Sequence, residues 1–393
     1  MSNSSLLAID AGVLLTPLEK FAPGRLIVDG TRLTDVGSPK TVTIPQNAQR
    51  IDALQMIVAP GFIDPHVHGA GGSDVMEGTF EALNIVSRTL SRHGTTSFLA
   101  TTVSSPPATL TSAIETIGSN LVRSFDGAQP LGIHLEGPFI SPAKRGTHKV
   151  ANITIPDADL LQRWIHAANN SIRLLTIAPE LPGTQELLRV AKAWRIAVAM
   201  GHSNATFQEA YSAVENGIHY AVHTFNAMRP FSHRDPGIVC EVLCDDRVFA
   251  EIIADGVHVD SSAIRLFSRV KEKTRVLLVT DSVSATDMPD GQYVLGNEVV
   301  NVTCSICRDS EGRLAGSTLT QDLALRNFTA WSGWSFEDAL LGLTSNAAQA
   351  LGLEAKGKLE PGADADIVLM DHSFRIMKTF VKGRLVFDHS WTN

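Results

Sequence analysis

The sequence has few cysteines and no excess of positive charge. It contains four cysteines in 393 residues, and its 33 lysines and arginines face 41 acidic residues, for a formal net charge of −8. Four cysteines in a chain of this length do not make a disulfide framework, so we expect a reducing, cytoplasmic compartment. The negative charge argues against a nucleic acid or an anionic membrane as partner.

Long apolar runs are also missing. No stretch approaches the ~18 apolar residues that a membrane span requires. Residues 1–12, MSNSSLLAIDAG, lack the basic start and apolar centre of a signal peptide, so we expect none. Hydrophobic residues at 44% and charged residues at 19% indicate a folded globular protein. The length favours one large domain with a smaller one.

The cysteines fall in two close pairs, Cys240/Cys244 and Cys304/Cys307. Two such pairs are able to hold a structural zinc ion. Neither pair is flanked by the glycine-rich turns of a zinc knuckle, and free cysteine packs as a small apolar residue. We therefore interpret all four as ordinary packed residues.

Strand-like apolar runs alternate with segments of helical periodicity through the middle of the chain. The eight strand-like runs are 57–63, 95–102, 131–136, 172–178, 196–201, 219–224, 248–254 and 276–281. Eight such repeats predict an α/β fold with a parallel sheet closed into a (β/α)8 TIM barrel. Residues 291–318 interrupt the pattern with β-like segments, which we interpret as an excursion before helical patterns resume.

Both ends of the chain are rich in short strands and glycine turns. Isolated strand pairs are marginally stable, so the two ends are expected to pair with each other. We predict that residues 1–56 and 357–393 form one small β-sandwich domain. Residues 57–356 then form the barrel, which would be the catalytic domain.

Residue types that bind metals follow the strand-like runs at several places. They are His66, His68, Glu136, His202, His223 and Asp281. Because the C-terminal ends of barrel strands meet at one mouth, we expect these side chains to lie together. Imidazole and carboxylate suit a borderline divalent ion such as zinc. The pattern predicts a metal-dependent hydrolase.

His66 and His68 are two residues apart, so both face the same side of an extended strand. A single histidine is more often a satisfied polar residue than a ligand. Two on one face, followed by the glycine-rich GAGGSD, favour a shared metal. His134 also shares a face with Glu136 but lies one layer deeper, where a hydrogen-bonded core histidine is the favoured interpretation.

Asp281 follows the eighth strand-like run and neighbours the first in a closed barrel. It would also serve as the N-cap of a following helix, but its position favours a functional role. A carboxylate at that place can take a proton from an attacking water and pass it to a leaving amine. A metal beside it would polarise the scissile carbonyl.

Loops after the sixth and seventh runs carry groups suited to an anionic substrate. Asn226, the backbone N–H of Ala227 and Arg234 follow the sixth run, and His258 follows the seventh. A guanidinium with backbone amides is a phosphate-binding set. Arg229 is a weaker competitor for this role, and a solvated surface arginine is the alternative for Arg234.

An ordered series of motifs resembles the amidohydrolase superfamily and, within it, the family of N-acetylglucosamine-6-phosphate deacetylases. In the family's order these are PGFIDPHVHGAGG, HLEGPFISPAKRGTH, GHSNAT, HTFNAM, ADGVHVD, TDSVSA and LAGSTLT. The resemblance covers essentially the whole chain. It implies hydrolysis of the acetamide of N-acetyl-D-glucosamine 6-phosphate to D-glucosamine 6-phosphate and acetate, in amino-sugar catabolism and cell-wall recycling.

The resemblance also implies roles for individual residues. Glu136, His202 and His223 would hold the principal metal, with Asp281 as acid and base and His148 supporting the developing oxyanion. In the family the phosphate-binding arginine comes from a neighbouring subunit, which implies a homodimer in which Arg234 reaches the neighbouring site. The residues implied to contact sugar or phosphate are Thr147, His148, Asn226, Ala227, Arg234, His258, Leu314, Ala315 and Gly316.

The implied metal is Zn²⁺, one or two ions per chain, with Fe²⁺, Mn²⁺ or Co²⁺ as alternatives. Some members of the family replace the second histidine of HVH and keep one metal, whereas both His66 and His68 are present here. Many other amidohydrolases bridge two metals with a modified lysine on strand four. Residues 172–178 contain no lysine, which leaves Glu136 as the candidate bridge.

Two alternatives to this function stay open. One is a deacetylase of another N-acetyl hexosamine phosphate, such as N-acetylgalactosamine 6-phosphate. The other is a non-catalytic barrel that serves as an assembly scaffold. Loss of metal ligands would indicate a scaffold, and the set in this sequence is complete.

Overall fold

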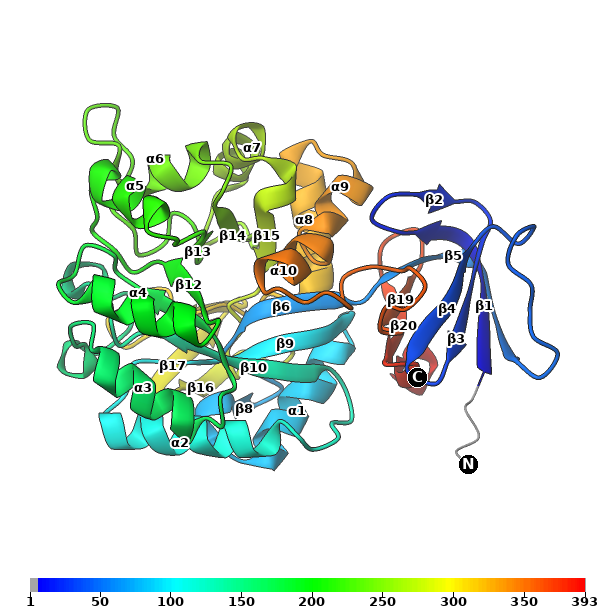
Figure 1. Cartoon of the computed structure of the whole chain (residues 1–393), viewed down its shortest axis with the longest axis horizontal. Helices are drawn as coiled ribbons and strands as arrows, with labels where there is room; N and C mark the ends of the chain where they lie inside the picture. Colours follow the sequence, from blue (N-terminus) through cyan, green and yellow to red (C-terminus); the bar gives the residue numbers. More distant parts are fainter. Residues whose placement is uncertain (1–5, 393) are drawn as a thin grey trace.

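A computed structural model describes residues 6–392 and shows a barrel of strands and helices beside a separate β-sheet (Figure 1). Residues 1–5 and 393, the outermost parts of the predicted small domain, lie outside the described residues. Within residues 6–392, no helix combines the length and the apolar character needed to cross a membrane.

Eight parallel strands form the barrel, in the order β15-β14-β13-β12-β11-β10-β9-β6. A backbone hydrogen bond of 2.8 Å from His68 to Ser282 and a bridge between Val67 and Ser282 join the first and last strands. The predicted (β/α)8 barrel is confirmed. The strands are β6 (Phe62–Val67), β9 (Thr95–Thr102), β10 (Gln129–Glu136), β11 (Ile172–Ile177), β12 (Ala197–Met200), β13 (Tyr220–Ala221), β14 (Phe249–Ile253) and β15 (Val276–Val279).

The first barrel strand starts later than the predicted run 57–63. Strand β5 (Gln49–Pro60) belongs to the other sheet, and the chain passes from one sheet to the other at Gly61. A β-carbon at Gly61 would lie 2.3 Å from the side chain of Thr96, so the close approach of the barrel wall requires glycine. His66 therefore lies inside β6 and not after its strand.

Helices surround the barrel (Figure 1). They bury apolar residues such as Leu83 of α1 and Phe267 of α7 in the same core as the outward side chains of the strands. Several begin at side-chain caps, as where the Thr79 hydroxyl accepts the N–H of Ala82. The helices are α1 (Phe80–Ser91), α2 (Pro107–Asn120), α3 (Ala158–Ala167), α4 (Thr184–Ala193), α5 (Phe207–Glu215), α6 (Gly237–Cys244), α7 (Ser261–Val270), α8 (Gln321–Ser332), α9 (Phe336–Leu341) and α10 (Ser345–Ala350).

Both ends of the chain contribute to one further sheet, with strands in the order β21-β20-β19-β5-β1-β3-β4 and β2 paired to β1. Its pairs are antiparallel except for β1 with β5. Ile9, Leu26, Ile367 and Phe380 share one core cluster, so the sheet encloses a core of its own. The strands besides β5 are β1 (Leu6–Leu15), β2 (Lys20–Phe21), β3 (Gly24–Asp29), β4 (Arg32–Gly37), β19 (Ile367–Met370), β20 (Ile376–Val381) and β21 (Arg384–Asp388).

This sheet confirms a β-domain built from both chain ends. The predicted boundary between residues 56 and 57 falls inside β5. The division into 1–56 with 357–393 and 57–356 stays a prediction.

The predicted β-like excursion after the eighth strand forms a small three-stranded antiparallel sheet. Its strands are β16 (Gly291–Leu295), β17 (Glu298–Thr303) and β18 (Ile306–Arg308). A shorter hairpin, β7 (Gly69–Ala70) with β8 (Ser73–Asp74), follows the HVH motif. The four cysteines form no disulfide. Cys307 is buried in β18, but Cys244 and Cys304 are exposed, so the interpretation of all four as packed residues is wrong for these two.

Candidate metal centre and active site

Glu136 lies at the centre of the histidines that the sequence analysis singled out. Its Oε1 is 3.1 Å from Nε2 of His202 and 3.0 Å from Nε2 of His223. Its Oε2 is 3.3 Å from Nε2 of His68. All four side chains are nearly inaccessible to solvent. The barrel thus gathers side chains that follow β6, β12 and β13 around the carboxylate at the end of β10.

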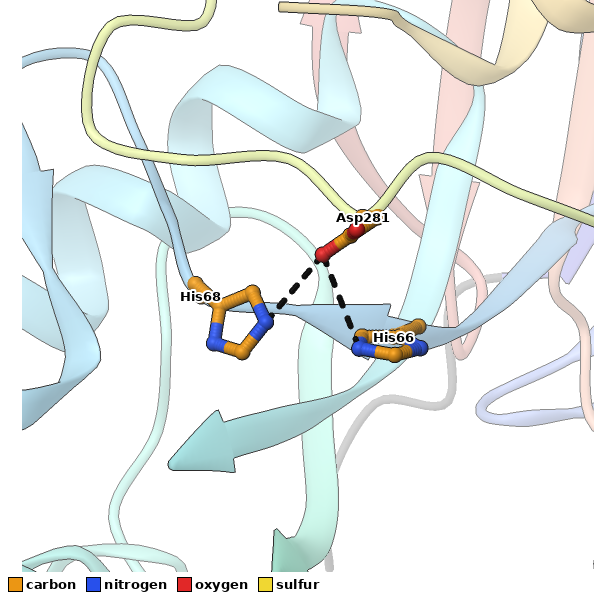
Figure 2. A group of neighbouring side chains, drawn as sticks. All are labelled: His66, His68 and Asp281. Carbon is orange, nitrogen blue, oxygen red and sulfur yellow. Dashed lines mark ion pairs between the residues drawn. The ribbon is translucent and has the colours of Figure 1, made fainter. Parts of the chain in front are cut away.

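His66, His68 and Asp281 form the other half of the cluster (Figure 2). Asp281 Oδ1 lies 3.1 Å from Nε2 of His68 and 3.6 Å from Nε2 of His66. His66 Nε2 also lies 3.4 Å from Glu136 Oε1. The two halves therefore share Glu136, the residue predicted as a bridge.

Four of the histidines have an oxygen acceptor at their second ring nitrogen, Nδ1. An oxygen there accepts the Nδ1 proton, so the neutral ring turns its Nε2 lone pair toward the cluster. This is the arrangement of a metal ligand. The pairs are His66 with Glu251 Oε2 (2.9 Å), His68 with the Thr101 carbonyl (3.0 Å), His202 with the Lys144 carbonyl (3.0 Å) and His223 with the Asn226 carbonyl (3.2 Å).

His148 has the opposite arrangement. Its Nδ1 accepts the backbone N–H of Ser104 at 3.1 Å, so the neutral ring carries its proton on Nε2. That Nε2 lies 3.5 Å from Glu136 Oε2. Proximity alone groups His148 with Glu136 and His202 as a possible metal site. The tautomer instead makes it a hydrogen-bond donor to the cavity.

The cluster has the chemistry of a cation site. His202 Nε2 and His223 Nε2 lie 3.1 Å apart and face the same carboxylate oxygen. Among the described residues, the buried Nε2 of His66 has no hydrogen-bond partner. Lone pairs crowded this closely in a buried site require a positive charge between them. Imidazole and carboxylate are ligands that Zn²⁺ and similar ions take, so these residues fit a divalent metal.

Electrostatics keeps the central carboxylate, Glu136, negatively charged. Burial raises the pKa of the Glu136 carboxyl, but the charge of His66 and the hydrogen bond of His148 outweigh burial and hold that pKa well below its usual value. Burial lowers the pKa of His202 to about 4, so this ring is neutral at physiological pH. A charged carboxylate beside a neutral imidazole is the protonation state that binds metal.

The second half of the cluster behaves differently when no cation is present. Burial lowers the pKa of His68, but Asp281 and Glu136 outweigh burial and raise that pKa to about 9. Burial likewise raises the pKa of Asp281, and the charges of His66 and His68 bring it below its usual value. A metal bound at this half would therefore displace a proton from His68.

Three of the predicted site residues leave their strands in a left-handed backbone conformation. The φ angles are 46° at His202, 30° at His223 and 51° at Asp281. Residues other than glycine rarely adopt this region, and each instance costs about 1–3 kcal/mol. At all three positions the left-handed backbone turns the side chain into the same barrel mouth. The fold therefore tolerates local backbone strain in order to assemble the cluster.

A cavity of ≈ 660 Å³ opens over the cluster. Leu295 of β16 and Val103 add apolar walls to the cavity. These walls were not predicted, because nothing in the sequence of residues 291–318 shows that this segment packs over the barrel mouth. Predicted substrate contacts that line the cavity are Thr147, His148, Asn226, Ala227, His258, Leu314 and Gly316.

Two predicted substrate contacts do not line this cavity. Ala315 is fully buried, and Arg234 is exposed on the loop between β13 and α6. Arg229, the competing arginine, is engaged in paired hydrogen bonds with the Asp235 carboxylate. The predicted reach of Arg234 into a neighbouring chain stays a prediction.

Two buried acids beneath the cluster, Asp64 and Glu251, were missed. Asp64 accepts the Thr280 hydroxyl at 2.7 Å, and burial raises its pKa to about 7. The signal that could have revealed them is an acidic residue in an otherwise apolar, strand-like stretch of sequence. His134 hydrogen-bonds to the hydroxyl of Thr176 at 2.8 Å, in agreement with its interpretation as a core histidine.

A parallel barrel whose mouth holds imidazoles and carboxylates is the architecture of a metal-dependent hydrolase. The model of the Amidohydrolase family matches residues 57–386, and the chain belongs to this family. Its members depend on metal ions. The predicted resemblance is thereby confirmed.

Two relatives and one solved structure are similar to this chain over most of its length. The N-acetylglucosamine-6-phosphate deacetylase of Lysinibacillus sphaericus is 37% identical over 342 residues, which cover 86% of this chain and 88% of the relative. The N-acetylgalactosamine-6-phosphate deacetylase of Escherichia coli O157:H7 is 35% identical over 343 residues, 87% of this chain and 90% of the relative. A mutant N-acetyl-D-glucosamine-6-phosphate deacetylase from Mycobacterium smegmatis, solved in complex with N-acetyl-D-glucosamine-6-phosphate, matches with a TM-score of 0.91 at 31% identity. That match covers 97% of this chain and 99% of the other.

Proposed function

We propose that the protein hydrolyses the acetamide of N-acetyl-D-glucosamine 6-phosphate, giving D-glucosamine 6-phosphate and acetate. The observation that carries this proposal is the cluster around Glu136 at the floor of a cavity lined by hydrogen-bonding groups. Relatives that match more than four-fifths of the chain bear the name of this activity. The reaction would serve amino-sugar catabolism in the cytoplasm.

In this proposal Glu136, His202 and His223 hold the principal metal ion, and His66 with His68 offers ligands for a second. Zn²⁺ is the favoured ion, with Fe²⁺, Mn²⁺ or Co²⁺ as alternatives. When bound, the metal polarises the amide carbonyl and makes a nearby water more acidic.

The proton chemistry falls to Asp281. Its Oδ1 faces the cluster beside His68, and its pKa below the usual value makes it a charged acceptor. It takes the proton of the attacking water and then delivers that proton to the nitrogen of the leaving amine. His148, whose Nε2 carries a proton, donates to the carbonyl oxygen as negative charge develops there.

The rim of the cavity would bind the sugar phosphate. The Asp255 carboxylate holds His258 Nδ1 at 2.7 Å, which leaves the other ring nitrogen for a sugar hydroxyl. Asn226 and the N–H of Ala227 line the same cavity. Arg234, exposed in its own chain, would reach the phosphate in the neighbouring subunit of a homodimer.

The galactosamine epimer is the second candidate substrate, because a relative with that name matches 87% of the chain. The two sugars differ only in the orientation of one hydroxyl group, far from the reacting amide. A scaffold without activity is disfavoured because every predicted ligand is present and points to the cluster.

Acetate release from a panel of sugars tests the proposal. We expect turnover of N-acetylglucosamine 6-phosphate in the presence of Zn²⁺, Mn²⁺, Fe²⁺ or Co²⁺ and much weaker turnover of unphosphorylated N-acetylglucosamine. Faster turnover of N-acetylgalactosamine 6-phosphate would favour the epimer. No acetate from any N-acetyl sugar phosphate with any of the four metals would refute the function.

A further inference from the structure

Glu251 is a buried carboxylate that touches both halves of the cluster from behind. It lies in β14 with an exposed fraction of 0%. Its Oε2 lies 2.9 Å from His66 Nδ1 and accepts the backbone N–H of His223 at 3.0 Å. Its Oε1 accepts the Tyr220 hydroxyl at 2.8 Å. Three donors, from β6, from β13 and from the turn just after β13, therefore converge on one carboxylate.

Fold stability alone gives little reason for a carboxylate at this position. Removing a charge from water costs several kcal/mol, and among the described residues neither a lysine nor an arginine pairs with Glu251, whose ion-pair partner is His66 of the cluster itself. A neutral side chain of similar size would fill the space in β14 more cheaply. The geometry of the contacts instead connects Glu251 to the cluster.

We propose that Glu251 is a positioning residue that fixes His66 and His223 for metal binding. Its Oε2 accepts the His66 Nδ1 proton, which turns the Nε2 lone pair toward Glu136 and Asp281. The same oxygen holds the backbone of His223 where φ is 30°, a conformation that the chain adopts only under such restraint. The negative charge also raises the basicity of the His66 lone pair.

Because one side chain orients a histidine in each half, Glu251 couples the two halves. Loss of its charge weakens the His66 ligand directly and weakens the hydrogen bond that holds the turn at His223. The inference rests on the proposed function only for the role that the cluster plays in catalysis. The orientation of the rings and the affinity for metal are measurable without any substrate.

Replacement of Glu251 by glutamine separates charge from shape. In Glu251→Gln the amide oxygen still accepts from His66 and His223 while the charge is lost. We expect competition with a chelator to show Zn²⁺ affinity lowered by roughly 10- to 100-fold, the usual effect of removing such an outer partner. The matched control is Tyr220→Phe, which removes only the third donor and is expected to stay close to the wild type. Equal Zn²⁺ affinity in Glu251→Gln and the wild type would overturn the inference.

A measurement on the unmodified protein covers the case in which Glu251→Gln does not fold. Nitrogen-15 NMR of histidine-labelled protein reports which ring nitrogen of His66 carries the proton, with the signal assigned by its loss in His66→Gln. Protonated Nδ1 in the Zn²⁺-loaded protein is expected, and a proton on Nε2 alone would contradict it. A wild type that binds Zn²⁺ but releases no acetate would refute the proposed function and leave this result standing.

Discussion

His148 and His202 lie side by side, with ring centroids 4.8 Å apart, yet their outer nitrogens meet opposite partners. The Lys144 carbonyl accepts a hydrogen bond from His202 Nδ1, whereas the Ser104 N–H donates a hydrogen bond to His148 Nδ1. At the residue scale, this difference suits His202 to ligate a metal and His148 to donate a hydrogen bond to a substrate, as the proposed function requires. Residue type and distance from Glu136 are nearly the same for both.

Alanine at each of these positions should therefore have different consequences. In His148→Ala the metal content should stay at the wild-type level while kcat falls by roughly 10²–10³, the effect of removing one oxyanion donor. In His202→Ala the principal metal should be lost together with activity. Elemental analysis of the dialysed proteins, alongside acetate release, distinguishes the two. Equal metal loss in both variants would show that His148 is a ligand.

Asp281 offers a second test at this scale. Asp281→Asn keeps the size of the side chain but cannot accept a proton, so kcat should fall by roughly 10²–10⁴. The metal that Glu136, His202 and His223 are proposed to hold should remain. Steady-state kinetics with elemental analysis checks both points, and Asp29→Asn in the exposed part of β3 is the control. Near-normal turnover in Asp281→Asn would remove this residue as the proton carrier.

At the scale of elements, one partly buried ion cluster connects the first barrel repeat to the last. His93, just after α1, lies 3.0 Å from Asp322 of α8 and 3.8 Å from Asp287 in the loop after β15. Burial lowers the pKa of His93, but the neighbouring carboxylates of Asp287 and Asp322 outweigh burial and raise that pKa to about 9. The protonated ring thus joins three elements where the barrel closes.

The stability that His93 contributes should depend on pH. Its pKa is about 9 in the folded protein and about 6.5 when unfolded, so the contribution is complete below pH ~6.5 and is lost as pH rises to ~9. A shift of this size corresponds to about 3 kcal/mol of unfolding free energy. Urea unfolding at pH 6.5 and pH 9.5 should therefore show a larger decline for the wild type than for His93→Gln. Identical declines would exclude this role for His93.

The repeating strands and helices could be predicted because each one produces a pattern within its own stretch of sequence. Apolar runs of strand length and helical periodicity located the eight repeats, and ligand types after those runs located the cluster. The first strand was misplaced because residues 57–63 form one unbroken apolar run, and only tertiary partners assign its two ends to different sheets. Leu295 and Glu251 were missed for the same reason, since neither a cavity wall nor an outer partner leaves a local pattern.

At the scale of the whole molecule, the cluster couples metal binding to folding. A cation binds the assembled mouth but not the unfolded chain, so it stabilises the protein by about 3 kcal/mol at a hundredfold excess over its Kd. The carboxylates and lone pairs around Glu136 are left crowded when the cation is removed.

Removal of metal with a chelator should accordingly lower the melting temperature, and added Zn²⁺ should restore it. Glu136→Gln is the control, because loss of the central carboxylate should abolish the response to Zn²⁺. Differential scanning calorimetry of metal-free and reloaded protein measures the change. A melting temperature that does not respond while the metal content falls to zero would contradict the coupling.

The end sheet has a mechanical consequence, because β1 and β21 carry the two ends of the chain in the same sheet. A stretching force applied between the termini would load the strand pairs β1–β5 and β20–β21 first. The barrel, threaded between β5 and β19, would stay shielded from tension until those pairs separate. If the enzyme is attached to a surface or pulled through a linker at either terminus, the catalytic mouth should therefore stay intact until the strand pairs β1–β5 and β20–β21 separate.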